Sequence, residues 1–177
     1  CIVGLVNGGE ADGNQKAREM ADNAKSYVCP GADAPPPNAT SVFTPMENCT
    51  VTASSDEGDG WSESACTGTS GYSLGIDSGD LRDNVIVNTP SGKKVDLEIW
   101  GLGGGGFSHV GPTADWRVHG PSREVHAVVF RRHMTIDEQG TENNTLVVVK
   151  IQGDLACVYD HIDAKKHPDA NVLAHVA

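Results

Sequence analysis

The chain has 177 residues, of which 38% are hydrophobic, 5% aromatic and 21% charged, and its 24 acidic and 13 basic residues leave a formal net charge of −11. This length suits one domain with at most one appendage. No apolar run approaches the roughly 18 residues of a membrane-spanning helix, and the acidic charge disfavours binding to nucleic acid or anionic membranes through bulk electrostatics.

The first 40 residues differ from the rest of the chain. Residues 1–6 form an apolar stretch typical of a strand, and the alanines and methionine of residues 12–27 recur at the spacing of three and four that predicts a helix. Residues 30–37 read PGADAPPP, which suits neither a helix nor a sheet ladder. We therefore expect an N-terminal strand–helix arm over 1–29, a Pro-rich connector over 30–40 and a β-rich body over 41–177.

From residue 41 onward, hydrophobic residues alternate with polar ones, which is typical of strands. The alternating or short apolar segments are 42–43, 49–52, 72–76, 85–87, 95–99, 116–118, 124–134, 145–152 and 157–159. The turn sequence Thr89–Gly92 predicts a hairpin, and a polar, Gly-containing loop predicts a second hairpin between residues 134 and 145. The sequence predicts a mainly β fold, as an antiparallel sandwich, an open barrel or one curved sheet of six to eight strands, with one N-terminal helix. It also predicts the start of a further helix near residue 168.

The five cysteines are Cys1, Cys29, Cys49, Cys66 and Cys157, and none belongs to a CxxC pair. Zinc and iron–sulfur sites usually need such pairs, whereas this spread fits disulfides formed in an oxidising compartment. We expect a Cys49–Cys66 disulfide across the acidic loop 54–60, with Cys29 and Cys157 as further disulfide cysteines. Because the number of cysteines is odd, at least one is free or joined to another molecule.

Three Asn-x-Ser/Thr sequons occur, at Asn38, Asn48 and Asn143. Coincidence is one explanation, and glycosylation in an exporting host is the other. If sugar is present, we expect it at Asn38 or Asn143 before Asn48, because the first two lie in predicted exposed connectors and Asn48 adjoins a cysteine. Cysteines and sequons together predict an exported protein, located outside the cell, at the cell surface or in the periplasm.

The glycine run Gly101–Gly106 matches the spacing of a dinucleotide-binding loop, but the residues after it (FSHVGP) do not begin a long helix. We interpret the run as a surface loop. Ser108 and His109 stand side by side, but Val110 occupies the position at which a nucleophile elbow requires glycine. The sequence therefore identifies no catalytic residue.

Metal sites have little support in the spacing of ligands. The seven histidines are His109, His119, His126, His133, His161, His167 and His175, and no two of them are two residues apart, as ligands on a strand require, or three or four apart, as ligands on a helix require. Asp77, Asp80 and Asp83 are candidate calcium ligands within one loop, and the alternative is that they form Asx turns. We expect no other cofactor.

Several segments together are similar to a group of small exported bacterial proteins without an assigned function. They are Gly71–Leu74, Ser78–Val85, Ala114–Val118, Val148–Ile151 and Cys157–Val158. The resemblance covers about residues 71–175 and implies export and a β-rich body, with no catalytic residues to carry over. It also implies a final helix that ends in a cysteine, whereas here a predicted helix ends at Cys29 and residue 177 is alanine.

One internal similarity bears on assembly. A cysteine is followed by Asp-x-Asn-x-x-Ala both in residues 1–17 and in residues 157–174, and chance is the alternative explanation. If the similarity is real, the arm of one molecule packs either on its own body or on the next subunit, where the contact propagates into a filament.

Three functions follow as hypotheses. We favour a non-catalytic exported structural or interaction protein, a self-assembling surface or filament-type subunit whose partners are copies of itself. The first alternative is a calcium- or carbohydrate-binding β module, in which Trp61, Trp100 and Trp116 would line a groove unless they belong to the core. The second alternative is a secreted hydrolase with a dispersed site.

Overall fold

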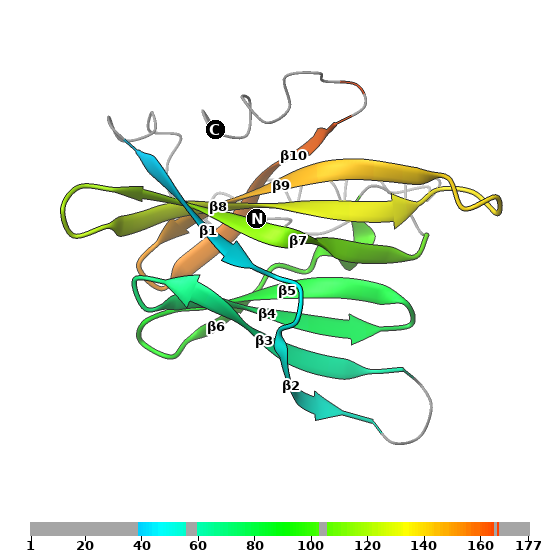
Figure 1. Ribbon diagram of the computed structural model, residues 1–177, viewed down its shortest axis with the longest axis horizontal. Coiled ribbons are helices and arrows are strands. Elements are labelled where there is room, and N and C mark those ends of the chain that lie inside the picture. The colour runs from blue at the N-terminus through cyan, green and yellow to red at the C-terminus, as the bar shows by residue number, and fades with distance from the viewer. Residues whose placement is uncertain (1–38, 56–59, 103–105, 165, 167–177) are drawn as a thin grey trace, which may run out of the picture.

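The computed structural model of the chain describes residues 39–55, 60–102, 106–164 and 166 (Figure 1). They form ten strands and one short 3₁₀ helix: β1 (Thr40–Pro45), β2 (Thr50–Ser54), β3 (Ser62–Thr69), β4 (Tyr72–Gly79), β5 (Arg82–Asn88), β6 (Lys94–Asp96), η1 (Ile99–Gly101), β7 (Ser108–His119), β8 (Glu124–Thr135), β9 (Glu142–Gln152) and β10 (Leu155–Asp163). No helix in these ranges is long and apolar enough to cross a bilayer. The predicted arm over 1–29 with its helix, the connector up to residue 38 and the helix start near 168 lie outside the described residues.

The ten strands form one sheet in the order β10-β9-β8-β7-β5-β4-β3-β2, with β1 beside β7 and β6 beside β5. Neighbouring strands run antiparallel, apart from a single parallel bridge between Arg82 of β5 and Ser108 of β7. The two strands at the ends of this path, β10 and β2, do not pair with each other, so the described sheet is open. The prediction of a mainly β body is confirmed, but the predicted strand number of six to eight is wrong.

Two strands depart most from the prediction, β3 because it was not expected and β7 because it is longer than expected. The sequence of β3, SESACTGT, consists mostly of small and polar residues, so it carries no strand pattern, yet it pairs with both β2 and β4. The predicted short strand at 116–118 belongs to the twelve-residue β7, which continues through Gly111 and Pro112. Proline is tolerated there because the pairing with β8 is interrupted between Val110 and Ala114.

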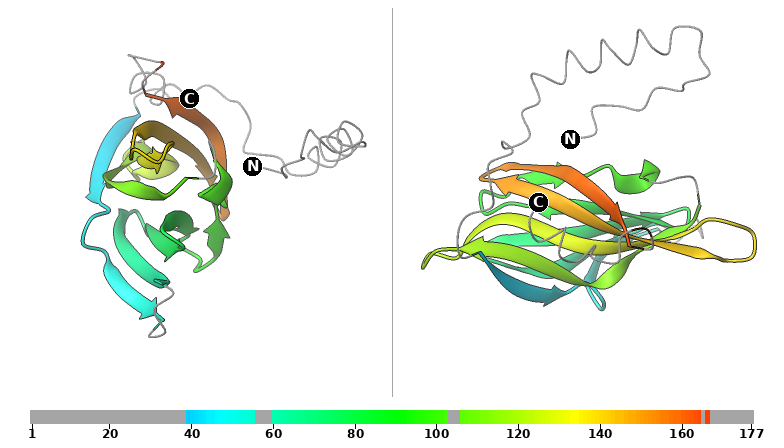
Figure 2. Two further views of the ribbon diagram at one scale, coloured as in Figure 1. Left: turned by 90° about the vertical axis from the view of Figure 1, so that its right-hand side faces the viewer. Right: turned by 90° about the horizontal axis from the view of Figure 1, so that it is seen from above.

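The open sheet bends so that its two halves share one core. In Figure 2 (left), β1 and β7–β10 curl around the upper half and β2–β6 lie beneath them. Residues of both halves belong to one buried cluster, among them Leu74 and Val85 from below and Trp116 and Phe130 from above. Trp116 has no exposed surface, and its indole N–H donates to Thr44 Oγ1 at 2.8 Å, which satisfies its polar atom inside the core.

A disulfide joins Cys49, just before β2, to the buried Cys66 of β3, as predicted. The two cysteines are 17 positions apart and their Cα atoms lie 4.5 Å apart. Closing a loop of this length stabilises the folded state by about 3 kcal/mol in the chain-entropy account. Cys157 is also disulfide-bonded, and its partner lies outside the described residues.

Candidate functional site

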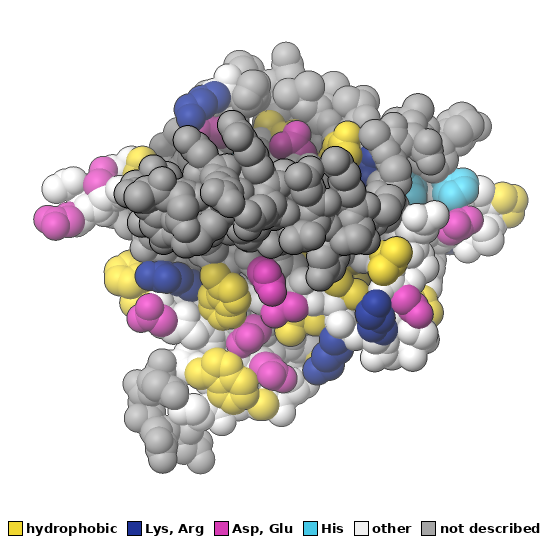
Figure 3. Space-filling view, turned by 180° about the vertical axis from the view of Figure 1, so that it is seen from behind, with side chains coloured by type: hydrophobic (Ala, Val, Ile, Leu, Met, Phe, Trp, Pro, Cys, Tyr) yellow, Lys and Arg dark blue, Asp and Glu magenta, His cyan; other side chains and the backbone are white. Residues whose placement is uncertain are grey.

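Three neighbouring loops at one end of the sheet, on the right in Figure 1, each carry a large exposed apolar side chain. They are Leu81 between β4 and β5, Phe107 before β7 and Ile136 after β8, exposed by 71%, 54% and 56%. Backbone hydrogen bonds hold the loops together: the N–H of Ser108 donates to the Leu81 carbonyl at 3.0 Å, and that of Thr135 to the Phe107 carbonyl at 2.8 Å. We call this surface, formed by Leu81, Phe107 and Ile136, the apolar end. In Figure 3, where this end lies on the left, hydrophobic side chains stand beside acidic and basic ones.

Leu81 occupies a turn position that normally takes glycine. Asp80 and Leu81 form a two-residue turn between paired strands, and both have a positive φ, 50° and 57°. This geometry matches a type I′ turn, in which the second residue is most often glycine because a side chain costs about 1 kcal/mol or more there. The turn at the other end of β4 has the same geometry in Ser70 and Gly71, with φ 52° and 82°, and uses glycine. Neither turn geometry nor burial therefore explains the leucine.

A buried arginine supports the apolar end from beneath. Arg132 of β8 is 2% exposed, and its guanidinium donates to the carbonyl of Leu102, to that of Trp100 at 3.3 Å and to Ser108 Oγ at 3.0 Å. Burial lowers the pKa of Arg132, while the carboxylate of Asp83 opposes that shift. An arginine keeps its charge at any ordinary pH, so it holds both loop carbonyls as a fixed donor.

The candidate calcium ligands are not brought together. Asp77 accepts a hydrogen bond from the indole of Trp61 at 3.0 Å, on one face of the sheet. Asp83 points to the opposite face, where it accepts the N–H of Val110 at 2.9 Å, and the side chain of Asp80 is 86% exposed in the turn. Among the residues that the structure describes, no group of three or more His, Cys, Asp or Glu is arranged to hold a metal ion.

Ser108 and His109 lie on opposite faces of β7, as successive strand residues do. Ser108 is 4% exposed, and its hydroxyl accepts a hydrogen bond from Arg132. A guanidinium donor is not a base, so this contact does not activate the hydroxyl as a nucleophile. Ser108 has a structural part in the support of the apolar end.

Two pairs of histidines that are far apart along the chain are in contact across the β7–β8 hairpin. The rings of His109 and His133 stack with centroids 4.7 Å apart, and Glu142 of β9 lies 3.6 Å from His133. Near the hairpin turn, His119 and His126 make an edge-to-face contact at 5.9 Å. His109 and His133 are register partners in β7 and β8. The sequence could have indicated this contact only through the similar number of residues that separates each histidine from the hairpin turn.

The Asn143 sequon is placed differently from the prediction. Asn143 lies in β9, not in a connector, and its side-chain amide donates to Asp163 of β10 at 3.4 Å. β9 begins at Glu142, so the loop after β8 is shorter than its polar composition suggested. Asn48 is exposed in the turn before β2, with a φ of 61°. Of these two, Asn48 is the accessible acceptor, and Asn38 lies outside the described residues.

Comparisons of the chain with protein-family models, with curated proteins and with solved structures find no match. The resemblance described from the sequence therefore stays an expectation, and the geometry of the chain itself carries the argument for function.

Proposed function

We propose that the protein is a non-catalytic, exported interaction protein that associates with copies of itself through the apolar end. The observation that carries the proposal is Leu81, a 71%-exposed leucine in a left-handed turn conformation. Exposed apolar groups on a free surface contribute nothing to folding, and strained conformations are concentrated at functional sites. Contact with a partner gives this side chain a favourable role.

The support beneath the surface favours binding. Arg132 holds the loop of Trp100 and Leu102, and Asp137 accepts the N–H groups of Gln139 and Thr141 at 3.1 and 2.8 Å in the β8–β9 loop. Loops that are ordered before binding lose less conformational entropy when a partner arrives. The apolar side chains are thus presented on a prearranged surface.

The charges around the surface are compatible with a second copy. Arg82 lies beside Leu81, whereas Asp80, Asp137 and Glu138 are exposed acidic residues of the same loops. In a two-fold contact each patch meets its own image, so that Arg82 of one molecule faces the acidic loops of the other. A surface with one sign of charge alone would not offer this arrangement.

The contact is expected to be weak and reversible. Burial of three large apolar side chains contributes about 1.5–3 kcal/mol each at most, and association costs much of that sum. The net charge of −11 on each molecule adds long-range repulsion. Salt shortens the reach of this repulsion from about 30 Å at 0.01 M to about 8 Å at 0.15 M, so association should strengthen with salt over that range.

Sedimentation velocity over a concentration series tests the proposal. The protein should self-associate, and Leu81→Asn or Phe107→Ser should weaken association at least about tenfold, because each removes a large apolar group from the contact. Leu155→Asn is the matched control, since Leu155 is 51% exposed at the start of β10, at the other end of the sheet. A protein that stays monomeric at every concentration, or a control that weakens association equally, contradicts the proposal.

Export has separate support. The Cys49–Cys66 disulfide and the disulfide of Cys157 suit an oxidising compartment, since cytosolic thiols are kept reduced. Fractionation of the source cells, followed by immunoblotting of the cytosol and the exported fraction, tests this part: protein confined to the cytosol would contradict it.

A further inference from the structure

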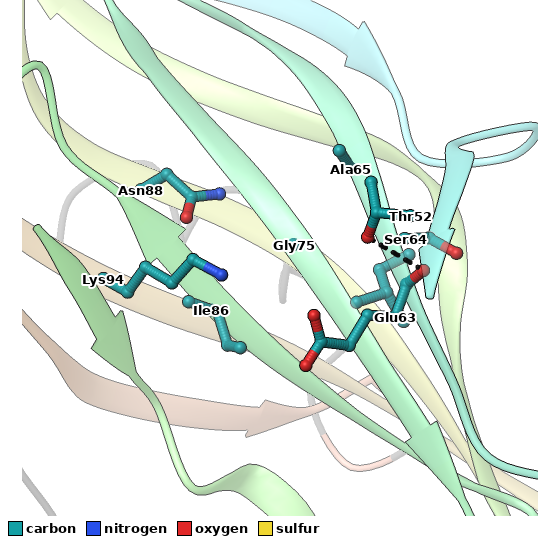
Figure 4. Close-up of a pocket in the computed structure, with 9 residues that line it drawn as sticks. Thr52, Glu63, Ser64, Ala65, Gly75, Ile86, Asn88 and Lys94 are labelled. Atoms are coloured by element: carbon teal, nitrogen blue, oxygen red, sulfur yellow. Dashed lines mark hydrogen bonds between the residues drawn. The ribbon is translucent and has the colours of Figure 1, made fainter. Parts of the chain in front are cut away.

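A second surface feature lies away from the apolar end, on the lower half of the sheet. It is a hollow of about 290 Å³ that crosses β2–β6, with Gly75 of β4 in the middle (Figure 4). Glu63 of β3 lines one side, and Asn88 of β5 and Lys94 of β6 line the other. Ile86 forms part of the floor between them.

The hollow exists because two small residues, Ala65 and Gly75, lie beside each other on β3 and β4. Ala65, Gly75 and Ile86 are successive register partners on β3, β4 and β5. A Cβ atom at Gly75 would meet its nearest neighbours, Ile86 and the Ser64 carbonyl, at an ordinary 3.6 Å, and the φ of Gly75 is not in the left-handed region. Neither packing nor backbone geometry requires glycine here, although glycine weakens a strand interior. The missing side chain leaves room for a ligand.

Opposite charges face each other across this room. In Figure 4 the carboxylate of Glu63 and the ammonium of Lys94 point toward one another above Ile86. None of the ion pairs between described residues includes either group. The amide nitrogen of Asn88 donates to Ser73 Oγ at 3.3 Å, lies 3.7 Å from the position of a Cβ atom on Gly75, and has a second N–H for a ligand in the hollow. One side of the hollow therefore suits an anionic group and the other a cationic group.

The floor of the hollow favours a ligand whose central part is aliphatic. Ile76 and Ile86 are aliphatic, and the residues that line the hollow include no aromatic ring on which a sugar could stack. A volume of about 290 Å³ is at the lower limit for ligand pockets, which favours a small molecule.

We propose that this hollow binds a small zwitterion with an aliphatic side chain, that is, an apolar amino acid or dipeptide. Its carboxylate would contact Lys94 and Asn88, its ammonium would contact Glu63, and its side chain would pack on Ile86. Because the hollow is open to solvent and exposed ion pairs are weak, the dissociation constant should be on the order of a millimolar.

Two-dimensional amide NMR of the full chain tests this proposal, with L-leucine and L-leucyl-L-leucine as the probes. At least one probe should shift the amide signals of Ala65, Gly75 and Ile86 saturably. N-acetyl-L-leucine amide, which has the same side chain without charges, should bind at least about tenfold more weakly. Unchanged signals with both probes overturn the proposal, and so does equal binding of the uncharged analogue. Shifts caused by maltose instead would identify a carbohydrate site and overturn it as well.

Variants connect the binding to the named residues. Glu63→Gln and Lys94→Gln should each weaken binding of the zwitterion about three- to tenfold, because each removes one exposed charge contact. Lys93→Gln is the matched control: it makes the same change one residue away, and Lys93 does not line the hollow. Gly75→Val, which should fit the strand but fill the floor, should abolish binding. Equal loss in the Lys93 variant, or full binding by both charge variants, overturns the proposal.

Discussion

The two ends of the sheet differ in how their turns are satisfied. At the end opposite the apolar end, side chains of turns and adjoining strand residues bond to neighbouring turns: Ser70 Oγ donates to the Arg123 carbonyl at 2.7 Å, Tyr72 OH to the Gly153 carbonyl at 3.0 Å and Ser91 Oγ to Asp154 at 2.7 Å. We call this the hydrogen-bonded end. At the apolar end, Leu81, Phe107 and Ile136 face solvent instead. The turns of the hydrogen-bonded end bond to one another and leave one large apolar side chain exposed, Leu155, whereas the apolar end exposes three on which a partner can gain binding energy.

The largest effect expected from a single change lies beneath the apolar end. Arg132→Met should destabilise the fold by about 3 kcal/mol, because the buried carbonyl of Leu102 and the partly buried carbonyl of Trp100 lose their donor. Urea unfolding monitored by fluorescence measures the loss. Arg131→Met, one residue along and only half-buried, is the control and should change stability by less than about 1 kcal/mol. Equal losses would mean that the apolar end has no special support.

An exchange of turn residues between the two ends should have opposite effects. Leu81→Gly should stabilise the fold by about 1 kcal/mol, since glycine adopts a positive φ without steric cost. Gly71→Leu should destabilise it by about 2 kcal/mol, because a side chain there meets both the positive φ and Pro90, which would lie 3.2 Å from the new Cβ atom. Thermal unfolding measures both. If Leu81→Gly lowers stability, the leucine has a structural role and the argument for a partner loses its main support.

The contacts of the hydrogen-bonded end are individually small. Ser70→Ala and Ser91→Ala should each cost about 0.5–1 kcal/mol, because both hydroxyls bond at exposed positions where water competes. Amide hydrogen exchange should become faster in the turns of that end and stay unchanged around Phe107. Faster exchange at both ends would show that the two ends are coupled, and it would contradict the separate stabilisation of their turns.

The smallest effect concerns acidification, because each end carries one histidine pair that is still partly solvated. Burial, then the charge of His109, lowers the pKa of His133 near the apolar end while Glu142 raises it; burial, then His119, lowers that of His126 near the hydrogen-bonded end. A histidine whose folded-state pKa lies below its ordinary value of about 6.5 takes up its proton first in the unfolded chain. Such a histidine therefore does not change the free energy of unfolding above about pH 6.5. It lowers that free energy as the pH falls from about 6.5 toward the folded-state pKa.

We therefore expect the free energy of unfolding to fall between about pH 7 and pH 5, and less so in His133→Gln and His126→Gln. Urea unfolding at a series of pH values measures this slope. Comparison of the two variants shows which end responds more strongly. Slopes equal to that of the unchanged protein in both variants would contradict the direction given for these pKa values.

Local features of the sequence were sufficient for part of the structure. The alternation in 124–134 and 145–152 predicted β8 and β9 within a few residues, and the turn Thr89–Gly92 does close the β5–β6 hairpin, with the Thr89 N–H bonded to the Lys93 carbonyl at 2.9 Å. The pairing of Cys49 with Cys66 also followed from their short separation. Such features are read from a few consecutive residues, because side-chain direction alternates along a strand and turn chemistry is local.

Register, bending and the ends of the sheet were decided only by the tertiary structure. The sequence contained His109 and His133 but not their pairing, which depends on the hairpin register and on the interruption of the ladder near Pro112. It did not show that Leu81 and Ile136 lie at the same end of the sheet, or that a hollow lies above Gly75. Both surfaces join residues from several strands whose separation along the chain carries no signal of contact. The composition and periodicity of this sequence determined that the body is a β-sheet, whereas its functional surfaces arise from non-local pairing, which a local pattern does not encode.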